Sequence, residues 1–132
     1  MKKKNSLDFE LIRQKIIQFN LARGWNQAPE DLAKSIVLEA AELLEHYQFD
    51  TSARRLKMKV KKKNTEELGS EVADVFFYLI IFCYQAKIDL LEAVEKKLDY
   101  AAKKYPVEMF NGRHNPDFYK EQKQKYRSAK KK

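Results

Sequence analysis

Four acidic side chains stand in two pairs of the same spacing, and they are the residues of this chain best placed to do chemistry. Glu39 and Glu42 form the first pair, and Glu71 and Asp74 form the second. On a helix, residues three apart share one face, with their Cβ atoms roughly 5–6 Å apart. Carboxylate oxygens are the ligands that Mg²⁺ prefers, so two such pairs facing each other would hold a divalent metal ion.

An ordinary solvated surface is the alternative reading of these acids. It explains Glu39 and Glu42 equally well when that pair is taken alone. It explains Glu71 and Asp74 less well, because their Val, Ala and Phe neighbours make an unpaired charge costly. Clustered carboxylates also raise one another's pKa, so the affinity for metal should rise with pH. His46 shares the flank of Glu39 and Glu42, but imidazole is a poor ligand for Mg²⁺.

Two aromatic residues stand at the ends of the helix that carries the first acid pair. Trp25 precedes this predicted helix and Phe49 follows it, and neither is needed to complete a helical core stripe. Flat rings can stack on a nucleobase, and Tyr78, on the same stripe as Glu71 and Asp74, could orient a phosphate or a sugar. Core filling is the alternative role of each ring taken singly.

Four helices must position these side chains. Hydrophobic periodicity, N-capping residues and helix-ending Gly and Pro predict helices over about residues 8–23, 29–48, 65–85 and 89–104. The third is apolar over most of its circumference, which favours the centre of a bundle or an oligomer interface. With only three Gly and three Pro in the chain, the composition predicts an all-α fold. We place residues 49–64 as an exposed basic connection, and the chain after Val107 as a loop and a partly frayed tail.

The length and the charge distribution limit the architecture further. A chain of 132 residues has the length of one domain, which we place at residues 1–110, followed by a basic, partly flexible tail at residues 111–132. The formal net charge is +8, but basic residues gather near both termini and in residues 54–63, so the rest of the chain is acidic. An acidic body with basic flanks fits a metal site approached by an anionic substrate. Solvated tails that keep the protein soluble are the alternative role of the termini.

Membrane and disulfide-stabilised classes are not expected. The longest uncharged run, residues 75–86, is too short to span a bilayer, and no apolar signal segment follows the N-terminal lysines. We therefore expect a cytoplasmic protein with no membrane partner. Cys83 is the single cysteine and lies in an apolar helical run, which predicts a buried hydrophobic residue and excludes a disulfide within the chain.

The order of these motifs resembles the MazG-type, all-α nucleoside-triphosphate pyrophosphohydrolases, and more closely their dCTP pyrophosphatase-like branch. The shared pattern is E-x-x-E, a spacer and E-x-x-D, which reads here as LEAAELLE at residues 38–45 and EVADVFFY at residues 71–78. The likeness continues through RGW at 23–25, YQF at 47–49 and KKYPVE at 103–108. It therefore covers about residues 7–108.

The resemblance implies a four-helix core that assembles as a homodimer or homotetramer. It also implies that Glu39, Glu42, Glu71 and Asp74 are the catalytic residues and hold Mg²⁺. The implied reaction is hydrolysis of a nucleoside triphosphate between the α- and β-phosphates, which releases a nucleoside monophosphate and pyrophosphate and clears unwanted nucleotides. Glu42 or Glu39 would accept the proton of the attacking water.

The substrate-binding residues follow from the same resemblance. Trp25 and Phe49 would pack on the base, and Tyr78 would lie near the substrate. Lys103 and Lys104 are candidates for binding the phosphates by their position and charge, although lysines at a helix end are commonly just solvated.

Two departures from the dCTP branch concern the base. A His and an Asn that are associated with that branch correspond to Ile16 and Ala101 here, so the resemblance supports the reaction more firmly than it supports cytosine. dCTP-like or modified nucleotides are the leading prediction. One alternative is a basic helical module that binds nucleic acid through residues 54–63 and the tail, although we do not expect a nucleic-acid partner. Another is a purely structural bundle that oligomerises through the third helix.

Overall fold

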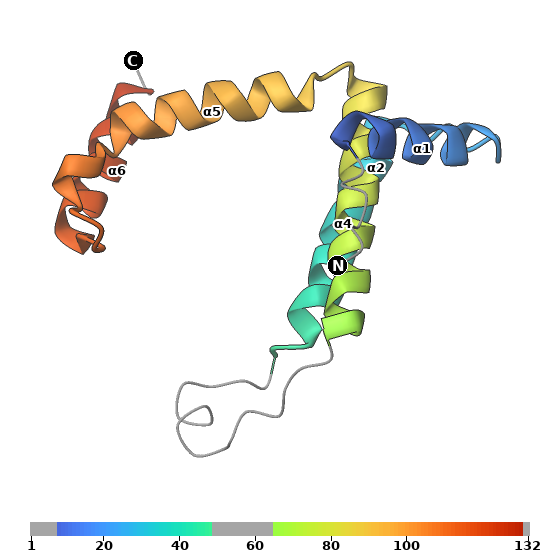
Figure 1. The fold of residues 1–132 in the computed structure, drawn as a ribbon, viewed down its shortest axis with the longest axis horizontal. Coiled ribbons are helices and arrows are strands. Elements are labelled where there is room, and N and C mark those ends of the chain that lie inside the picture. The colour runs from blue at the N-terminus through green and yellow to red at the C-terminus, as the bar shows by residue number, and fades with distance from the viewer. Residues whose placement is uncertain (1–7, 49–64, 131–132) are drawn as a thin grey trace, which may run out of the picture. The chain divides into compact units, whose positions relative to one another are not determined.

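The computed structural model describes residues 8–48 and 65–130, which form five α-helices and a short 3₁₀ helix without any strand (Figure 1). The elements are α1 (Phe9–Leu21), α2 (Pro29–Glu45), α4 (Thr65–Ala86), α5 (Leu90–Lys104), η1 (Val107–Met109) and α6 (Pro116–Ala129). The predicted all-α class is confirmed, and each of the four predicted helices ends within one turn of its observed bounds. Within the described ranges, no helix is both long and apolar enough to cross a membrane.

Local sequence signals explain where the helices begin and end. Gly24 follows α1 with a φ of +65°, a left-handed conformation that glycine adopts without strain, and its N–H donates to the Leu21 carbonyl at 2.9 Å. Pro29 occupies the first position of α2, where its missing N–H is not needed. The Asp89 side chain caps α5 by accepting a hydrogen bond from the Glu92 N–H at 3.0 Å.

The chain divides into two compact units, with the boundary between Ile88 and Asp89. In the first unit, α2 and α4 lie side by side as an antiparallel pair, and α1 packs against α4 (Figure 1). The side chains buried in this core are Ile17, Leu32, Ile80, Ile81 and Cys83. The prediction that Cys83 is buried is confirmed. α4 supplies most of this core because it is apolar on several sides.

The second unit consists of α5, η1 and α6, and neither α5 nor α6 contains a fully buried residue. Aromatic contacts join its two long helices. Tyr105 stacks on Tyr119 with ring centroids 5.0 Å apart, and Tyr100 meets Tyr126 edge to face at 5.5 Å. We predicted α5 as the fourth helix of the core, and it falls in this second unit together with η1 and α6.

The prediction of a loop after Val107 is wrong, because η1 and the four-turn helix α6 occupy that part of the chain. Asn115 caps α6 by accepting a hydrogen bond from the Phe118 N–H at 3.2 Å, and Pro116 stands at the first helical position. This combination is a known start signal for a helix. The domain boundary at residue 110 stays a prediction.

Candidate metal centre and adjoining hollow

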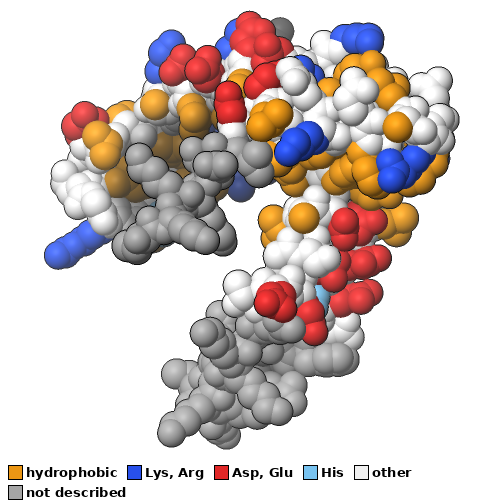
Figure 2. Space-filling view, turned by 45° about the vertical axis from the view of Figure 1, so that its right-hand side comes forward, with side chains coloured by type: hydrophobic (Ala, Val, Ile, Leu, Met, Phe, Trp, Pro, Cys, Tyr) orange, Lys and Arg blue, Asp and Glu red, His pale blue; other side chains and the backbone are white. Residues whose placement is uncertain are grey.

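Three of the four predicted acids come together between α2 and α4. Glu39 and Glu42 on α2 and Glu71 on α4 each offer one carboxylate oxygen, and these three oxygens lie within 4.8 Å of one another. They meet because the antiparallel pairing places Glu71 opposite the one-turn pair on α2. In Figure 2, acidic side chains gather along this helix pair, with a histidine among them. A cluster of oxygens this tight can share one cation.

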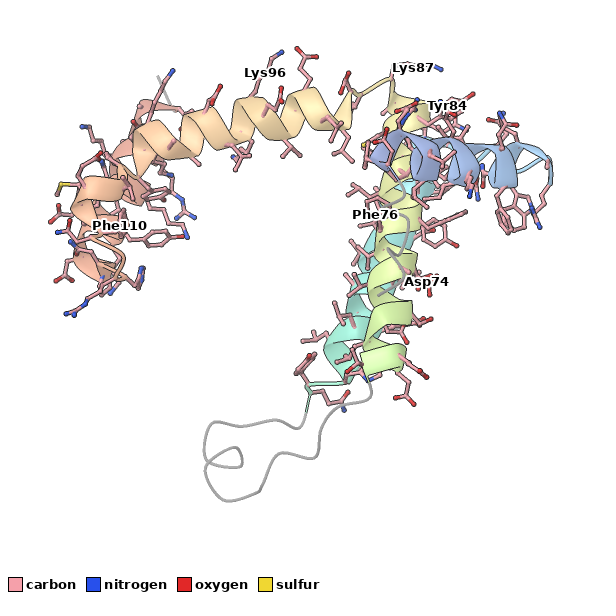
Figure 3. The ribbon with its side chains drawn as sticks, in the orientation of Figure 1. Asp74, Phe76, Tyr84, Lys87, Lys96 and Phe110 are labelled. Carbon is pink, nitrogen blue, oxygen red and sulfur yellow. The ribbon has the colours of Figure 1, made fainter. Side chains whose placement is uncertain are left out.

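Asp74, the fourth predicted acid, lies one turn beyond Glu71 on α4 and is exposed (Figure 3). It is not one of the three converging residues, but its charge reaches them. Partial burial, and after it the negative charges of Glu42, Asp74 and Glu71, raises the pKa of the Glu39 carboxyl. The four acids therefore form one electrostatic group, in which each negative charge acts on the others.

His46 lies next to this group. Its Nε2 atom is 3.6 Å from Oε1 of Glu71, and both side chains are partly buried. His46 follows the last residue of α2, so its ring projects toward the first half of α4. A protonated ring at this distance would attract the Glu71 carboxylate and hold it in place. The geometry therefore favours a positioning role for His46 over a role as a metal ligand.

An open hollow of about 450 Å³ is lined by residues 24–27 and by Tyr78. Trp25 contributes a ring that is 45% exposed. Tyr78 follows Asp74 by four residues on α4, so the two share a face and lie about 6 Å apart along the helix axis. The two predicted aromatic residues that the structure describes thus line a hollow about two helical turns along α4 from Glu71.

The loop that forms the hollow is tied to two helices. Asn20 of α1 is only 2% exposed, and its Nδ2 donates to the Trp25 carbonyl at 2.8 Å and to Gln27 Oε1 at 3.3 Å. Gln85 of α4 donates from Nε2 to Asn26 Oδ1 at 3.0 Å. Asn20 supports the site but was not among the residues predicted from the sequence. Its polar type within the apolar stripe of the first helix was the available signal.

Aromatic side chains of α1 and α4 support the Trp25 ring. Its ring meets Phe19 edge to face at 6.0 Å, and Phe19 meets Phe77 of α4 in the same way at 5.8 Å. The Arg23 guanidinium carbon lies 3.4 Å from the centroid of the Phe19 ring, and its Nη1 donates to the Phe19 carbonyl at 2.8 Å. This stack fixes the orientation of Trp25 from the α1 and α4 side.

The roles of the other predicted substrate-binding residues, Phe49, Lys103 and Lys104, stay predictions. Phe49 lies outside the described residues. Lys103 and Lys104 lie at the end of α5 in the second unit, so their predicted role in phosphate binding stays a prediction. Lys104 is half-buried, between the rings of Tyr105 and Tyr126, with its Nζ 5.1 Å and 5.3 Å from their centroids.

Comparison with known proteins places this arrangement in a family. Residues 34–115, which include all four acids and the Tyr78 side of the hollow, match the MazG-like family. The chain belongs to the MazG-like family. The resemblance seen in the sequence motifs is thereby confirmed.

Named relatives and a solved structure agree with the family assignment. Two proteins named dCTP pyrophosphatase 1 match this chain. The one from Rattus norvegicus is 31% identical over 105 residues, which are 78% of this chain and 62% of that protein. The one from Homo sapiens is 29% identical over 102 residues, which are 76% of this chain and 60% of that protein. This MazG-like chain thus spans about 62% of the length of such relatives. The crystal structure of a pyrophosphatase from Archaeoglobus fulgidus aligns with a TM-score of 0.64 and 36% identity, over 74% of this chain and 91% of that one.

The donor set of this MazG-like chain fits a hard divalent cation. Carboxylate oxygens alone converge, which suits Mg²⁺ better than a metal that prefers nitrogen or sulfur ligands. Partial burial, and after it the repulsion from Glu42, Asp74 and Glu71, raises the pKa of Glu39. A bound cation would relieve that repulsion, so the residues present match the group that the motif predicts.

Proposed function

We propose that this chain is a nucleoside-triphosphate pyrophosphohydrolase that cleaves its substrate between the α- and β-phosphates and releases a nucleoside monophosphate and pyrophosphate. The observation that carries the proposal is a cluster of converging carboxylates between α2 and α4, with an aromatic-lined hollow about two helical turns further along α4. Such a layout suits a substrate with a charged, metal-binding end and a flat, stacking end. Membership of the MazG-like family and relatives named as pyrophosphatases support the same reaction.

Glu39, Glu42, Glu71 and Asp74 would hold Mg²⁺. A bound Mg²⁺ supplies charge neutralisation at the phosphates and lowers the pKa of the attacking water. The residues of the chain orient the phosphates and accept the proton of the water. Glu42 and Glu39 are the two candidate bases for that proton.

The hollow would take the nucleoside. Its volume of about 450 Å³ falls within the range of small-ligand sites, and Trp25 and Tyr78 supply aromatic faces for a base and a sugar. Phe49 is proposed as a further ring on the base. A dCTP-like or modified pyrimidine nucleotide is the preferred substrate, since relatives carry the name dCTP pyrophosphatase 1. Ile16 and Ala101 stand where the dCTP branch has a His and an Asn, so the resemblance supports the reaction more firmly than the base.

We also propose that the chain functions in the cytoplasm as a homodimer or homotetramer. Val37 and Leu44 lie seven residues apart on one face of α2, and they are 68% and 65% exposed. Val72 of α4 is exposed as well. A second copy of the chain would cover these side chains. Light scattering should show a mass above 15.7 kDa for the native chain, and a lower mass for Val37→Glu/Leu44→Glu. A native monomer would refute this part.

The decisive experiment measures pyrophosphate release from a panel of canonical and modified nucleoside triphosphates in the presence of Mg²⁺. Glu71→Gln keeps the size of the side chain and removes one ligand charge, so turnover should be lost. Glu30→Gln, an exposed acid in the first turn of α2, is the matched control and should retain turnover. If the native protein releases no pyrophosphate from any substrate, the proposed activity is wrong.

Nucleotide binding can be read separately from turnover. Trp25 is the single tryptophan of the chain, so intrinsic fluorescence reports on the hollow directly. Titration of Glu71→Gln with each triphosphate should quench or shift this fluorescence in the order of base preference. If the native protein hydrolyses nucleotides but their binding does not change the Trp25 emission, the base does not bind in the hollow.

A further inference from the structure

A seam of lysine and tyrosine side chains runs between the two long helices of the second unit. Its members are Lys97, Tyr100 and Lys104 of α5, Tyr119, Lys123 and Tyr126 of α6, and Lys130, which directly follows α6. On each helix these residues are spaced by three or four positions, so they share one face. The two faces meet at the edge-to-face contact of Tyr100 with Tyr126. We call this set the lysine–tyrosine seam.

The lysines of the seam lie over its rings. The Nζ atoms of Lys97 and Lys130, from different helices, are 5.6 Å and 5.9 Å from the centroid of the same Tyr100 ring. Lys104 lies 5.3 Å from the ring of Tyr126. Each contact is a cation–π interaction, which stabilises one charge but does not neutralise it. The seam therefore gathers positive charge from both helices along one line.

No carboxylate neutralises this charge within the described part of the unit. The ion pair found among residues 89–130 joins Lys96 to Glu92, and Lys96 lies about 100° around α5 from Lys97. Beyond it, the sequence from Lys120 to Lys132 contains seven basic residues and one acidic residue. Like charges held in a row repel one another, and an anion placed along the row would relieve that repulsion.

We propose that the lysine–tyrosine seam binds single-stranded nucleic acid. The row of lysines matches a row of phosphates, and a single strand offers unstacked bases to the neighbouring rings. Tyr119 is 37% exposed and stacks parallel to Tyr105, and Lys123 Nζ lies 5.6 Å from its centroid, so a supported ring and a charge stand together at one end of the row. The sequence analysis named nucleic-acid binding through residues 54–63 and the tail only as an alternative, and the helix α6 now gives the basic residues of the tail a defined face. The inference does not depend on the proposed hydrolase activity.

The primary test is the salt dependence of binding. Fluorescence anisotropy of a labelled 15-nucleotide single strand is measured with the full chain at several NaCl concentrations. Four phosphate contacts predict a slope of about −3 in a plot of log affinity against log salt concentration. Failure to bind at low salt, or a slope near zero, would overturn the proposal.

A matched pair of variants separates the seam from net charge. Lys97→Gln/Lys104→Gln/Lys123→Gln/Lys130→Gln should weaken binding at least tenfold and flatten the salt slope. Lys96→Gln/Lys103→Gln/Lys120→Gln/Lys125→Gln removes four charges from the same two helices, at lysines that lie over no ring among the described residues, and should change affinity less than threefold. Equal losses from both sets would overturn the seam as a site. Circular dichroism checks helix content, and replacement of the four seam lysines by Arg should retain binding if the protein folds.

Two further arms identify the ligand and the role of the rings. Tyr119→Ala should weaken binding of the single strand several-fold while leaving the salt slope unchanged, and Tyr119→Phe should keep the affinity. A duplex of the same sequence should bind less tightly than the single strand. Competition by free nucleoside triphosphates at equal phosphate concentration would instead assign the seam to a nucleotide and contradict a nucleic-acid ligand.

Discussion

The acid cluster of the first unit and the lysine–tyrosine seam of the second are both concentrations of like charge, but their shapes differ. The three carboxylate oxygens of the acid cluster converge within 4.8 Å, between two helices that share a packed core. The lysines of the seam are spread along two helices and lie over rings. A convergent cluster is relieved best by a point charge such as a metal ion, and an extended row is relieved best by a polyanion.

The two regions also differ in what holds them in shape. The acids stand on helices anchored by buried side chains such as Leu32 and Ile81, so their spacing is fixed by a hydrophobic core. α5 and α6 contain no fully buried residue and meet through tyrosine contacts. The geometry of the first region is therefore set independently of its ligand, as metal binding requires, whereas the second region can adapt to a strand of variable sequence.

The largest expected effect distinguishes the two regions by their response to metal. Glu42→Gln should reduce turnover about 100-fold or more, because a metal ligand supplies several kcal/mol of transition-state stabilisation. It should also abolish the rise in melting temperature that Mg²⁺ gives the native chain. The variant that replaces the four seam lysines by Gln should keep that Mg²⁺-dependent rise. Thermal melts with Mg²⁺ and with EDTA measure both, and loss of the rise in the seam variant would contradict the assignment of metal to the acids.

The next effect concerns the aromatic face of the hollow. Trp25→Ala should raise KM about 5- to 100-fold, since base stacking on an aromatic side chain contributes roughly 1–3 kcal/mol. The value of kcat should change less, because in the proposed complex Trp25 contacts the base and the acids contact the phosphates. Trp25→Phe retains a stacking ring and serves as the control. Steady-state kinetics on the preferred nucleotide decide the matter, and an unchanged KM in Trp25→Ala would remove Trp25 from the substrate site.

Much of this layout follows from the sequence because its signals are local. Pro29, Gly24 and Asp89 mark helix ends through their own backbone chemistry, and the E-x-x-E spacing alone places Glu39 and Glu42 on one face. α6 was missed because its sequence is dominated by charged and polar residues and lacks an apolar stripe, although its Asn115-Pro116 start was readable.

Other features depend on how the helices pack. The approach of His46 to Glu71, and the position of Asp74 beside the three converging acids, depend on the rotation of α2 against α4. No spacing within a single helix encodes that rotation. Asn20 was hidden for a related reason, since its partners at Trp25 and Gln27 lie in a turn whose path is set only when the chain folds back.

A smaller effect tests the support of the hollow. Asn20→Ala removes two hydrogen bonds and should lower the free energy of unfolding by about 1–2 kcal/mol. The loss is limited because Oδ1 of Asn20 is buried and has no partner among the described residues, and this unsatisfied acceptor disappears as well. Asn20→Asp should be worse, because a carboxylate cannot donate to the Trp25 carbonyl. Urea unfolding followed by Trp25 fluorescence ranks the three proteins, and an Asp variant as stable as the native chain would contradict this role.

The smallest effect comes from the partial burial of Glu39 and, after it, the negative charges of the neighbouring acids. Since the folded state raises the pKa of Glu39, the native chain retains that proton to higher pH than the unfolded chain. Stability therefore falls as the pH rises through the window between the ordinary glutamate pKa and the raised one, and the full penalty persists at neutral pH. Without metal, Glu39→Gln should melt a few degrees higher than the native chain at neutral pH, and this advantage should vanish below the ordinary glutamate pKa.

The addition of Mg²⁺ should reverse that order, because the native cluster gains a ligand-bound state that Glu39→Gln cannot form as well. Melting curves from pH 4 to pH 8, in EDTA and in Mg²⁺, test whether Glu39→Gln is more stable than the native chain without metal and less stable with it. Glu30→Gln is the control and should melt like the native chain under both conditions. A Glu39→Gln variant that is less stable in EDTA at neutral pH would mean that the cluster is held by partners within the chain. The contrast between a point-charge site and a polyanion row would then lose its physical basis in the first unit.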